Sequence, residues 1–357
     1  MTFFSILRKM TTAIVLLFLS TGNLFAGDTT SSSKINILAV PILGYEPETR
    51  GHFGAVALLS FDLNSGTDLR SSVAKTKLQY TLNKQLISEV EWDIFFREEK
   101  WFSSGQIHFS KYPDFYYGIG PNTSKDSELS YQSNRFSVDV RVLKKLRDNF
   151  FGGINTGYTR YSNFKFSEEN IKFGELKNSD NYHFGITGLL DTRNSILNAT
   201  EGLYLLAEAG FHFSESNYSS LLLDFRTYHR WRDRVILAGR MFLDSRFGDP
   251  PFFNMAFQGG DQWVRGYLLG RFRDRNLGAL QMELRIHLIG RFGFAVFGGM
   301  SSLAASADRL ITEDLKWNGG AGIRFLIDRE NSVNLRIDFA LGERGNRGFY
   351  VSFGESF

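Results

Sequence analysis

Two short stretches place a histidine two residues before a serine, a pattern that could support nucleophilic catalysis. They are His108-Phe109-Ser110 and His212-Phe213-Ser214. On a β-strand a spacing of two puts both side chains on one face, and a serine nucleophile needs a nearby base to accept its proton. No third residue that would orient either histidine is identifiable from the sequence.

Metal and cofactor chemistry have less support. The other histidines are scattered, with no pair at metal-ligand spacing and no cysteine to help: His52, His183, His229 and His287. The glycine pairs Gly259-Gly260 and Gly298-Gly299 do not lead into a helix with a following lysine, as a phosphate loop requires. The sequence therefore predicts no metal and no cofactor.

Strict alternation of apolar and polar residues predicts the elements that carry these side chains. In the clearest stretch, 280–288, Leu, Met and Ile alternate with Gln281, Glu283, Arg285 and His287. The same alternation recurs in 89–97, 136–142, 221–228 and 333–341. Charged residues at every second position cannot be buried in a sandwich core without a large desolvation cost. They can line a hydrated lumen while the other face meets lipid, so the fold class is all-β, a transmembrane antiparallel β-barrel.

The same alternation shows which way the side chains of the two histidine–serine pairs point. Phe109 and Phe213 occupy apolar positions, so their polar neighbours point into the lumen, away from a lipid substrate. We therefore interpret both pairs as polar lumen residues and predict that the protein is not an enzyme. A lumenal or lipid-acting hydrolase is the less favoured alternative.

The N-terminus is typical of a secreted protein. Arg8 and Lys9 precede a short apolar stretch, and Ala26 is a plausible cleavage point. We predict a signal peptide at 1–26, a short linker at 27–35 and the barrel at 36–357. Cleavage would remove two of the 41 basic residues and none of the 38 acidic ones, and such a nearly neutral chain argues against a nucleic-acid partner.

Turn-like breaks divide the barrel into about 16 strands. The short breaks lie at 64–68, 97–100, 144–149, 231–234 and 328–331, and the longer ones near 111–128, 163–180, 247–275 and 302–315. Short turns face the periplasm in outer-membrane barrels and long loops face outward. With both termini periplasmic, all short breaks fall inside and all long ones outside, which supports the prediction.

The last residues look like an assembly signal. Phe349, Val351 and Phe353 share the phase expected to face lipid, and the chain ends in Phe357. Such endings resemble the signal by which outer-membrane barrels are delivered for assembly. Phe353 and Phe357 are therefore predicted to be read by the barrel-assembly machinery, which with outer-membrane lipids would be the partners of this protein.

Several motifs together resemble the bacterial surface antigen family, the barrel domain shared by the BamA and TamA insertases and two-partner secretion transporters. The stretches Pro41-Ile42-Leu43-Gly44-Tyr45 and Tyr116-Tyr117-Gly118-Ile119-Gly120 look like the opening hairpin and third outer loop of that family. Asp191 and Arg193, followed by Gly202, match its mid-barrel periplasmic turn. Val264-Arg265-Gly266-Tyr267 matches the motif of its sixth outer loop.

The resemblance implies that this sixth loop folds into the lumen. There Arg265 would be held by Glu283, Gly266 would permit a tight backbone and Tyr267 would pack inside. The family usually supplies a second acidic residue, but this chain has Gly299 at that position, so the lock is expected to have a single, weaker partner. Asp191 and Arg193 are expected to brace their turn as a charge pair or to be solvated.

The function implied by the resemblance is insertion or translocation of protein or lipid at the bacterial outer membrane. In this view the inward loop plugs the lumen and a weak seam between the first and last strands opens laterally. The family's N-terminal periplasmic domains are not found in this sequence, which leaves two alternatives. One is a passive pore or structural barrel; the other is an accessory barrel with a separate periplasmic partner protein.

Overall fold

A computed structural model describes residues 36–46, 50–63, 70–82, 84–166, 177–261, 263–329 and 332–357. The predicted signal peptide, 1–26, and linker, 27–35, lie outside these residues. No helix among the described residues is long and apolar enough to cross a membrane.

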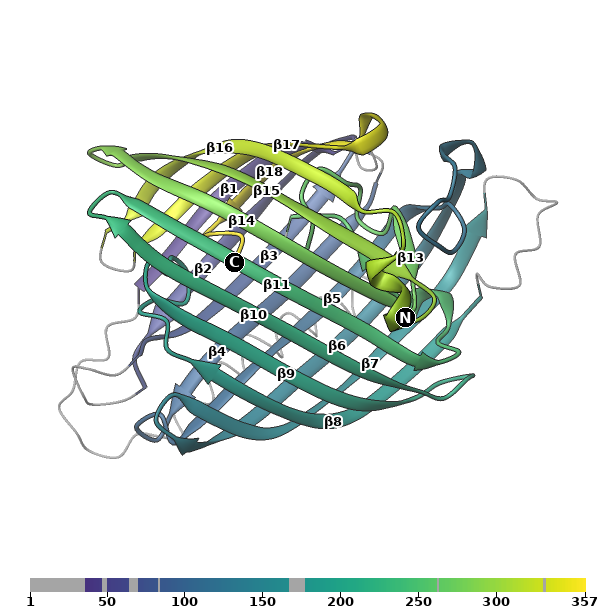
Figure 1. Cartoon of the computed structure of the whole chain (residues 1–357), viewed down its shortest axis with the longest axis horizontal. Coiled ribbons are helices and arrows are strands. Elements are labelled where there is room, and N and C mark those ends of the chain that lie inside the picture. The colour runs from purple at the N-terminus through teal and green to yellow at the C-terminus, as the bar shows by residue number, and fades with distance from the viewer. Residues whose placement is uncertain are drawn as a thin grey trace, which may run out of the picture. The chain divides into compact units, whose positions relative to one another are not determined.

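Sixteen strands form one antiparallel sheet in chain order (Figure 1), which confirms the predicted strand number. They are β1 (Asn36–Glu46), β2 (Arg50–Phe61), β3 (Ser72–Thr81), β4 (Leu86–Phe96), β5 (Trp101–Tyr116), β6 (Leu129–Arg147), β7 (Phe150–Phe166), β8 (Ser179–Asp191), β9 (Gly202–Phe213), β10 (Tyr218–Arg232), β11 (Val235–Gly248), β14 (Asn276–Ile289), β15 (Phe292–Ala304), β16 (Lys316–Asp328), β17 (Val333–Gly342) and β18 (Arg347–Phe353). A separate hairpin, β12 (Ala256–Gln258) and β13 (Phe272–Asp274), lies in the connection between β11 and β14.

Four single-turn helices lie in the connections. They are η1 (Lys125–Ser127), η2 (Phe252–Asn254), η3 (Ala307–Ile311) and η4 (Glu343–Gly345). The four long breaks predicted from the sequence all fall at one end of the sheet and the five short ones at the other. Other connections at the long-loop end are short, among them 82–85, 214–217 and 343–346.

The outward face of the strands is apolar, as the alternation predicts. On β14, Leu280 and Met282 are 45% and 58% exposed, whereas Gln281, Glu283 and Arg285 between and beside them are buried. The inward polar side chains can form hydrogen bonds in the lumen. The outward apolar side chains place no unsatisfied polar group in lipid. This is the arrangement expected of a membrane-spanning strand.

The inner face is not polar throughout. At the short-turn end, each of the six consecutive strands β4 to β9 contributes one side chain to a buried apolar cluster: Phe95, Phe102, Leu143, Phe151, Leu189 and Leu206. The rings of Phe95 and Phe102 lie 4.6 Å apart, and the Arg70 guanidinium lies 4.3 Å from the Phe95 centroid. The alternation predicts polar residues on the inner face, but at this end apolar side chains occupy it.

The first and last strands meet without the ladder that joins every other neighbouring pair. β1 lies beside β18 (Figure 1), yet among the described residues no backbone pairing joins the two strands. Contact is made by side chains: Val56 and Leu58 of β2 share a buried cluster with Val333 and Phe353. We call this boundary between β1 and β18 the seam.

The seam also explains where Phe353 lies. This residue was expected to face lipid, but only 7% of it is exposed, because the apolar residues of β1 and β2 cover it. The side chain of Asn36 at the start of β1 reaches past β18 and donates a hydrogen bond of 3.0 Å to Asp328 on β16. The sheet ends therefore pack face against face at this point.

Candidate functional site: a buried arginine network in the lumen

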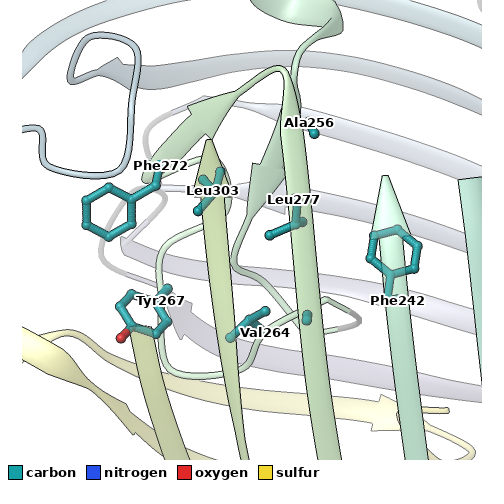
Figure 2. Packing of buried hydrophobic residues seen from close by; sticks show 8 residues of the cluster. Phe242, Ala256, Val264, Tyr267, Phe272, Leu277 and Leu303 are labelled. Carbon is teal, nitrogen blue, oxygen red and sulfur yellow. The ribbon is translucent and has the colours of Figure 1, made fainter. Parts of the chain in front are cut away.

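The loop between β11 and β14 carries Val264-Arg265-Gly266-Tyr267 and packs on the inner face of the sheet. Val264, Arg265 and Tyr267 are at most 1% exposed. Figure 2 shows Val264, Tyr267 and Phe272 gathered against strand residues. These partners include Leu277 of β14 and Leu303 of β15. Apolar burial thus holds the loop inside the barrel.

Arg265 contacts two carboxylates from different strands. Its Nη2 donates to Glu283 Oε2 of β14 at 2.5 Å, and its Nη1 donates to Asp338 of β17. The Phe297 ring of β15 stacks on the guanidinium, with the Cζ 3.4 Å from the ring centroid. The planar fork of arginine suits such recognition, which a lysine could not reproduce.

The expectation of a single-partnered lock is wrong. Asp338 supplies the second carboxylate, from a position 73 residues along the chain. Gly299 could not have done so in this geometry, because a Cβ there would lie 2.5 Å from the Leu280 carbonyl oxygen and 3.0 Å from Asn318 Oδ1. The β14 backbone therefore lies too close to Gly299 of β15 for a side chain at this position.

The contact is part of a larger charge-balanced network on the inner wall. Around Arg265 lie three more arginines and two more carboxylates besides Glu283 and Asp338: Arg285, Arg324, Arg336, Asp261 and Glu355. We call these eight residues the lumen network. Four guanidinium groups face four carboxylates, so no net charge is buried.

Within the lumen network Glu283, Asp338 and Glu355 each contact arginines from more than one element. Asp338 accepts from Arg324 Nη1 at 2.5 Å and from Arg336 Nη1 at 2.8 Å. Arg336 also donates to both oxygens of Asp261 in the loop, at 2.7 and 2.6 Å. The loop is therefore held by two separate ionic contacts, one through Arg265 and one through Asp261.

The loop backbone is held by strands next to the seam. Gly266 has φ +101°, and a Cβ there would lie 2.8 Å from the Leu341 carbonyl. Its amide donates to the Tyr350 hydroxyl of β18 at 2.9 Å. The Tyr267 hydroxyl donates to the Trp317 carbonyl at 2.7 Å and accepts from the Glu343 amide at 3.0 Å.

The same loop is tied to the connection between β5 and β6. Arg271 donates to the Thr123 hydroxyl and carbonyl, both at 2.8 Å, and its guanidinium lies 4.2 Å from the Tyr117 centroid. The Gly120 amide donates to the Arg273 carbonyl at 2.7 Å. These contacts join the two connections to each other at the long-loop end.

A family model described as the Omp85 superfamily domain matches residues 60–357. The chain belongs to the Omp85 superfamily. This finding confirms the resemblance to BamA-type barrels, and the protein is accordingly a bacterial outer-membrane barrel. No curated protein sequence is similar enough to this one to count as a match.

Solved structures similar to this Omp85 barrel share its fold at low sequence identity. BamA from Haemophilus ducreyi lacking POTRA domains 1–3 is 12% identical over 91% of this chain and 70% of that one, with a TM-score of 0.54. CdiB from Escherichia coli is 11% identical over 91% and 67%, with a TM-score of 0.57. CdiB from Acinetobacter baumannii is 11% identical over 89% of this chain, which spans 58% of that protein, with a TM-score of 0.53.

The mid-barrel turn of the Omp85 barrel contains a buried ion pair. Arg193 Nε and Nη2 donate to the two oxygens of Asp191, both at 2.9 Å, and both side chains are almost fully buried. The solvated alternative is therefore wrong. Gly202 has φ +102°, and a Cβ there would lie 2.3 Å from the Thr192 carbonyl oxygen, so the turn closes only around glycine.

The last residues turn into the lumen of the Omp85 barrel. The Glu355 amide donates to the Leu197 carbonyl at 3.0 Å, and the Phe357 carbonyl accepts from Arg285 Nη2 at 2.7 Å. The Phe357 side chain is buried with Ala199 and Tyr228. The residues predicted as an assembly signal are thus covered in the folded barrel, so their reading by the assembly machinery stays a prediction about the unfolded chain.

Ser214 and His108, from the two histidine–serine pairs weighed by spacing, are recorded in contact with other residues. Ser214 lies beyond the end of β9, where its hydroxyl donates to the Ser216 carbonyl at 2.7 Å. His108 Nδ1 lies 3.7 Å from Glu89. Among the described residues no group of three or more His, Cys, Asp or Glu side chains could hold a metal ion.

Sequence reasoning missed most of the lumen network. It identified Arg265 and Glu283, but not Asp338 or the other three arginines. A signal was available, since alternation within 333–341 puts Arg336 and Asp338 on the inner face. What the alternation could not provide is which inner residues meet across the lumen.

Proposed function

We propose that this Omp85 barrel inserts or translocates protein or lipid at the outer membrane. In this mechanism the lumen network holds the sixth outer loop as a plug, and the seam between β1 and β18 opens laterally to let a client enter the bilayer. Outer-membrane lipids are the surroundings in which this occurs. A separate periplasmic partner protein would deliver the client.

The observation that carries the proposal is the side-chain packing of the seam. Separating two laddered strands breaks a row of backbone hydrogen bonds, each of which is costly to leave unmade in lipid. The described part of the seam has apolar contacts of Phe353 with Val56 and Leu58 instead. Opening there exposes apolar surface to lipid, which costs little because lipid is itself apolar.

The experiment uses a cysteine pair across the seam, in a chain that has no native cysteine. Asn36→Cys and Asp328→Cys replace side chains that contact each other at 3.0 Å, and a short bis-methanethiosulfonate, which reacts with one thiol at each end, would join them through reducible disulfides. The purified protein is placed in liposomes, and the folding rate of an added unfolded outer-membrane barrel is measured.

We expect the wild type to accelerate folding of the added barrel and the cross-linked variant to lose this effect. A reducible linker restores it on reduction, and Asn36→Cys alone behaves as wild type. No acceleration by the wild type, or full acceleration with the seam joined, would refute the proposal.

The alternative of a passive pore has a specific observation against it. Val264, Arg265 and Tyr267 are buried against the inner wall, and Arg271 and Arg273 of the same loop are hydrogen-bonded to the connection between β5 and β6. An open pore would need this loop released. Steady conductance of the wild type in planar bilayers would favour the pore.

A further inference from the structure

Three polar residues meet on the inner face of three neighbouring strands, away from the lumen network. His212 Nε2 on β9 lies 2.8 Å from Ser220 Oγ on β10. His212 Nδ1 lies 3.2 Å from the side-chain amide of Asn181 on β8. His212 and Asn181 are 8% and 5% exposed. The serine is neither of those that spacing along the sequence suggested, because the contact crosses between strands.

From this geometry we infer that Ser220, His212 and Asn181 form a hydrolytic site that cleaves acyl esters. Ser220 is the nucleophile, His212 is the base and Asn181 is the positioning residue. These are the relations by which a serine site is recognised, a nucleophile in contact with a base that a third side chain orients. The inference is independent of the insertion function proposed above.

The orientation of the Asn181 amide decides which ring nitrogen of His212 carries the proton. The oxygen and nitrogen of an amide are assigned from the hydrogen-bond network and exchange by a half-turn. With the oxygen toward His212, it accepts the Nδ1 proton and leaves Nε2 free to accept the Ser220 proton. The Tyr218 hydroxyl, 3.3 Å from Asn181, then accepts from the amide nitrogen, since a phenol both donates and accepts.

The imidazole is held in place for this role. The Tyr218 ring stacks on His212 with centroids 4.3 Å apart and planes 12° apart. Tyr218 is itself 3% exposed. Because stacking and two polar contacts fix the ring, Nε2 stays directed at the hydroxyl, as efficient proton transfer requires.

The surroundings leave the hydroxyl accessible and place a paired cation beside the site. The register partner of Ser220 on β9 is Gly210, where a Cβ would lie 3.2 Å from Ser220 Oγ; glycine leaves that space free. Its partner on β11 is Arg246, and directly opposed residues have Cβ atoms about 5 Å apart. The Arg246 guanidinium is paired with Asp244 and donates to the Asn254 carbonyl, so it lies next to the site as a paired cation and is assigned no contact with the ester.

The reaction needs only the ester and water. Ser220 Oγ attacks the carbonyl carbon while its proton passes to His212 Nε2. The tetrahedral species collapses, the ester C–O bond breaks, and the leaving alkoxide takes that proton, giving an alcohol and an acyl-serine. His212 then takes a proton from water, the resulting hydroxide attacks the acyl-serine, and the Ser220 Oγ–carbonyl bond breaks. The proton on His212 returns to Ser220 Oγ and the acid is released. The site lies next to the 214–217 connection at the long-loop end, so the substrate class is a small acyl ester that enters from outside.

The test uses the full-length protein in detergent with p-nitrophenyl butyrate and a fluorophosphonate probe. We expect the wild type to hydrolyse the ester and to be labelled, and Ser220→Ala to lose labelling and about 100-fold or more of the rate. His212→Ala should do the same. Ser219→Ala and Ser214→Ala, at neighbouring serines outside the cluster, should keep both.

The role of Asn181 is tested by comparing the hydrolysis rates of two variants, because a purely structural role would not distinguish them at equal stability. Asn181→Asp keeps an oxygen toward Nδ1 and should retain most of the rate, whereas Asn181→Leu should lose it with unchanged heat-modifiability. Absence of labelling in the wild type would overturn the inference. So would equal labelling of Ser220→Ala, or equal rates for Asn181→Leu and the wild type.

Discussion

Arg265 shows why the plug contact depends on one side-chain shape. Its two Nη atoms reach carboxylates on different strands, Glu283 and Asp338, while its plane stacks on Phe297. An ammonium group has the charge but not the fork or the flat face. Charge alone is therefore not sufficient at this position.

We predict that Arg265→Ala lowers the free energy of unfolding by about 3–5 kcal/mol, because removing one partner leaves buried carboxylates uncompensated. Arg265→Lys should recover only part of this loss. The measurement is the temperature at which the barrel loses its heat-modifiable gel mobility. Arg275→Ala is the control, since Arg275 lies in the same loop and pairs with the exposed Asp249, and such pairs contribute about 0–1 kcal/mol.

Asp261 makes the second ionic contact of the loop sensitive to acid. Burial acts to raise the pKa of Asp261, but Arg336 and then Arg265 outweigh it, so the pKa lies below its ordinary value. A carboxylate with a lowered pKa stabilises the folded state above its unfolded pKa, and that stabilisation is lost as pH falls through the folded pKa.

We therefore predict that the loop loosens in acid, as pH drops below about 4, the ordinary pKa of an aspartate. Proteolysis within 259–271 at decreasing pH is the measurement. Asp261→Asn should show loosening already at neutral pH and a weaker dependence on acid. Equal pH profiles for both proteins would count against the contact.

At the residue scale, the sequence motif identified Arg265 and Glu283 but mistook the number of partners. Because Gly299 stands where the family usually has the second acidic residue, one partner was expected for Arg265. Asp338, from another strand, provides the second carboxylate. Alternation tells which way a side chain points and not which inner residue it meets. That pairing depends on barrel curvature, which no local pattern encodes.

Among the elements, the sixth outer loop depends on one glycine conformation. Gly266 combines φ +101° with the Leu341 backbone 2.8 Å from where a Cβ would be. Gly290, in the β14–β15 turn, has φ +62° with no atom within 4 Å of such a Cβ. Comparing an alanine substitution at these two positions distinguishes the free-energy cost of a left-handed backbone from that of a steric clash.

We predict that Gly266→Ala is more destabilising than Gly290→Ala. The latter should cost roughly 1 kcal/mol from backbone strain alone. Gly266→Ala should cost at least about 2–3 kcal/mol, because the strand or the loop must also move. Thermal unfolding of both variants in one detergent tests the difference, and equal losses would show that the loop gives way without cost.

The strands themselves were predictable because lipid and lumen impose opposite demands on alternate residues. β14 illustrates this, with Met282 outward and Glu283 inward. The prediction failed where both faces are apolar, as at Phe95 and Phe96 of β4. A doubly apolar stretch has no phase, so the lumen cluster around Phe95 has no signature in the sequence.

For the molecule as a whole, the strand count was predictable but the closure was not. Breaks and phases give sixteen strands in an up-and-down order. The seam has no motif, because Val56, Leu58 and Phe353 are ordinary strand residues until the curved sheet brings its ends together. Phe353 was accordingly assigned to lipid, although β1 and β2 cover it.

We predict that the wild-type barrel conducts poorly and that Arg265→Ala raises its single-channel conductance in planar bilayers several-fold. The loop is held by the lumen network, so weakening one contact lets ions pass more often. Arg275→Ala should conduct like the wild type. If Arg265→Ala conducts no better, the loop stays in the lumen without the ionic contacts.

The backbone hydrogen bond between Gly120 and Arg273 limits the positions at which a foreign peptide can be inserted on the outer surface. An epitope inserted at Gly120 would separate two loops that share a backbone hydrogen bond, and the plug beneath would lose its cover. Among the described residues no backbone hydrogen bond joins the tip of the η3 connection to another loop, and Ile311 at this tip is 91% exposed. An epitope placed after Ile311 should be displayed on intact cells with the barrel undisturbed, so antibody staining there reports surface orientation directly.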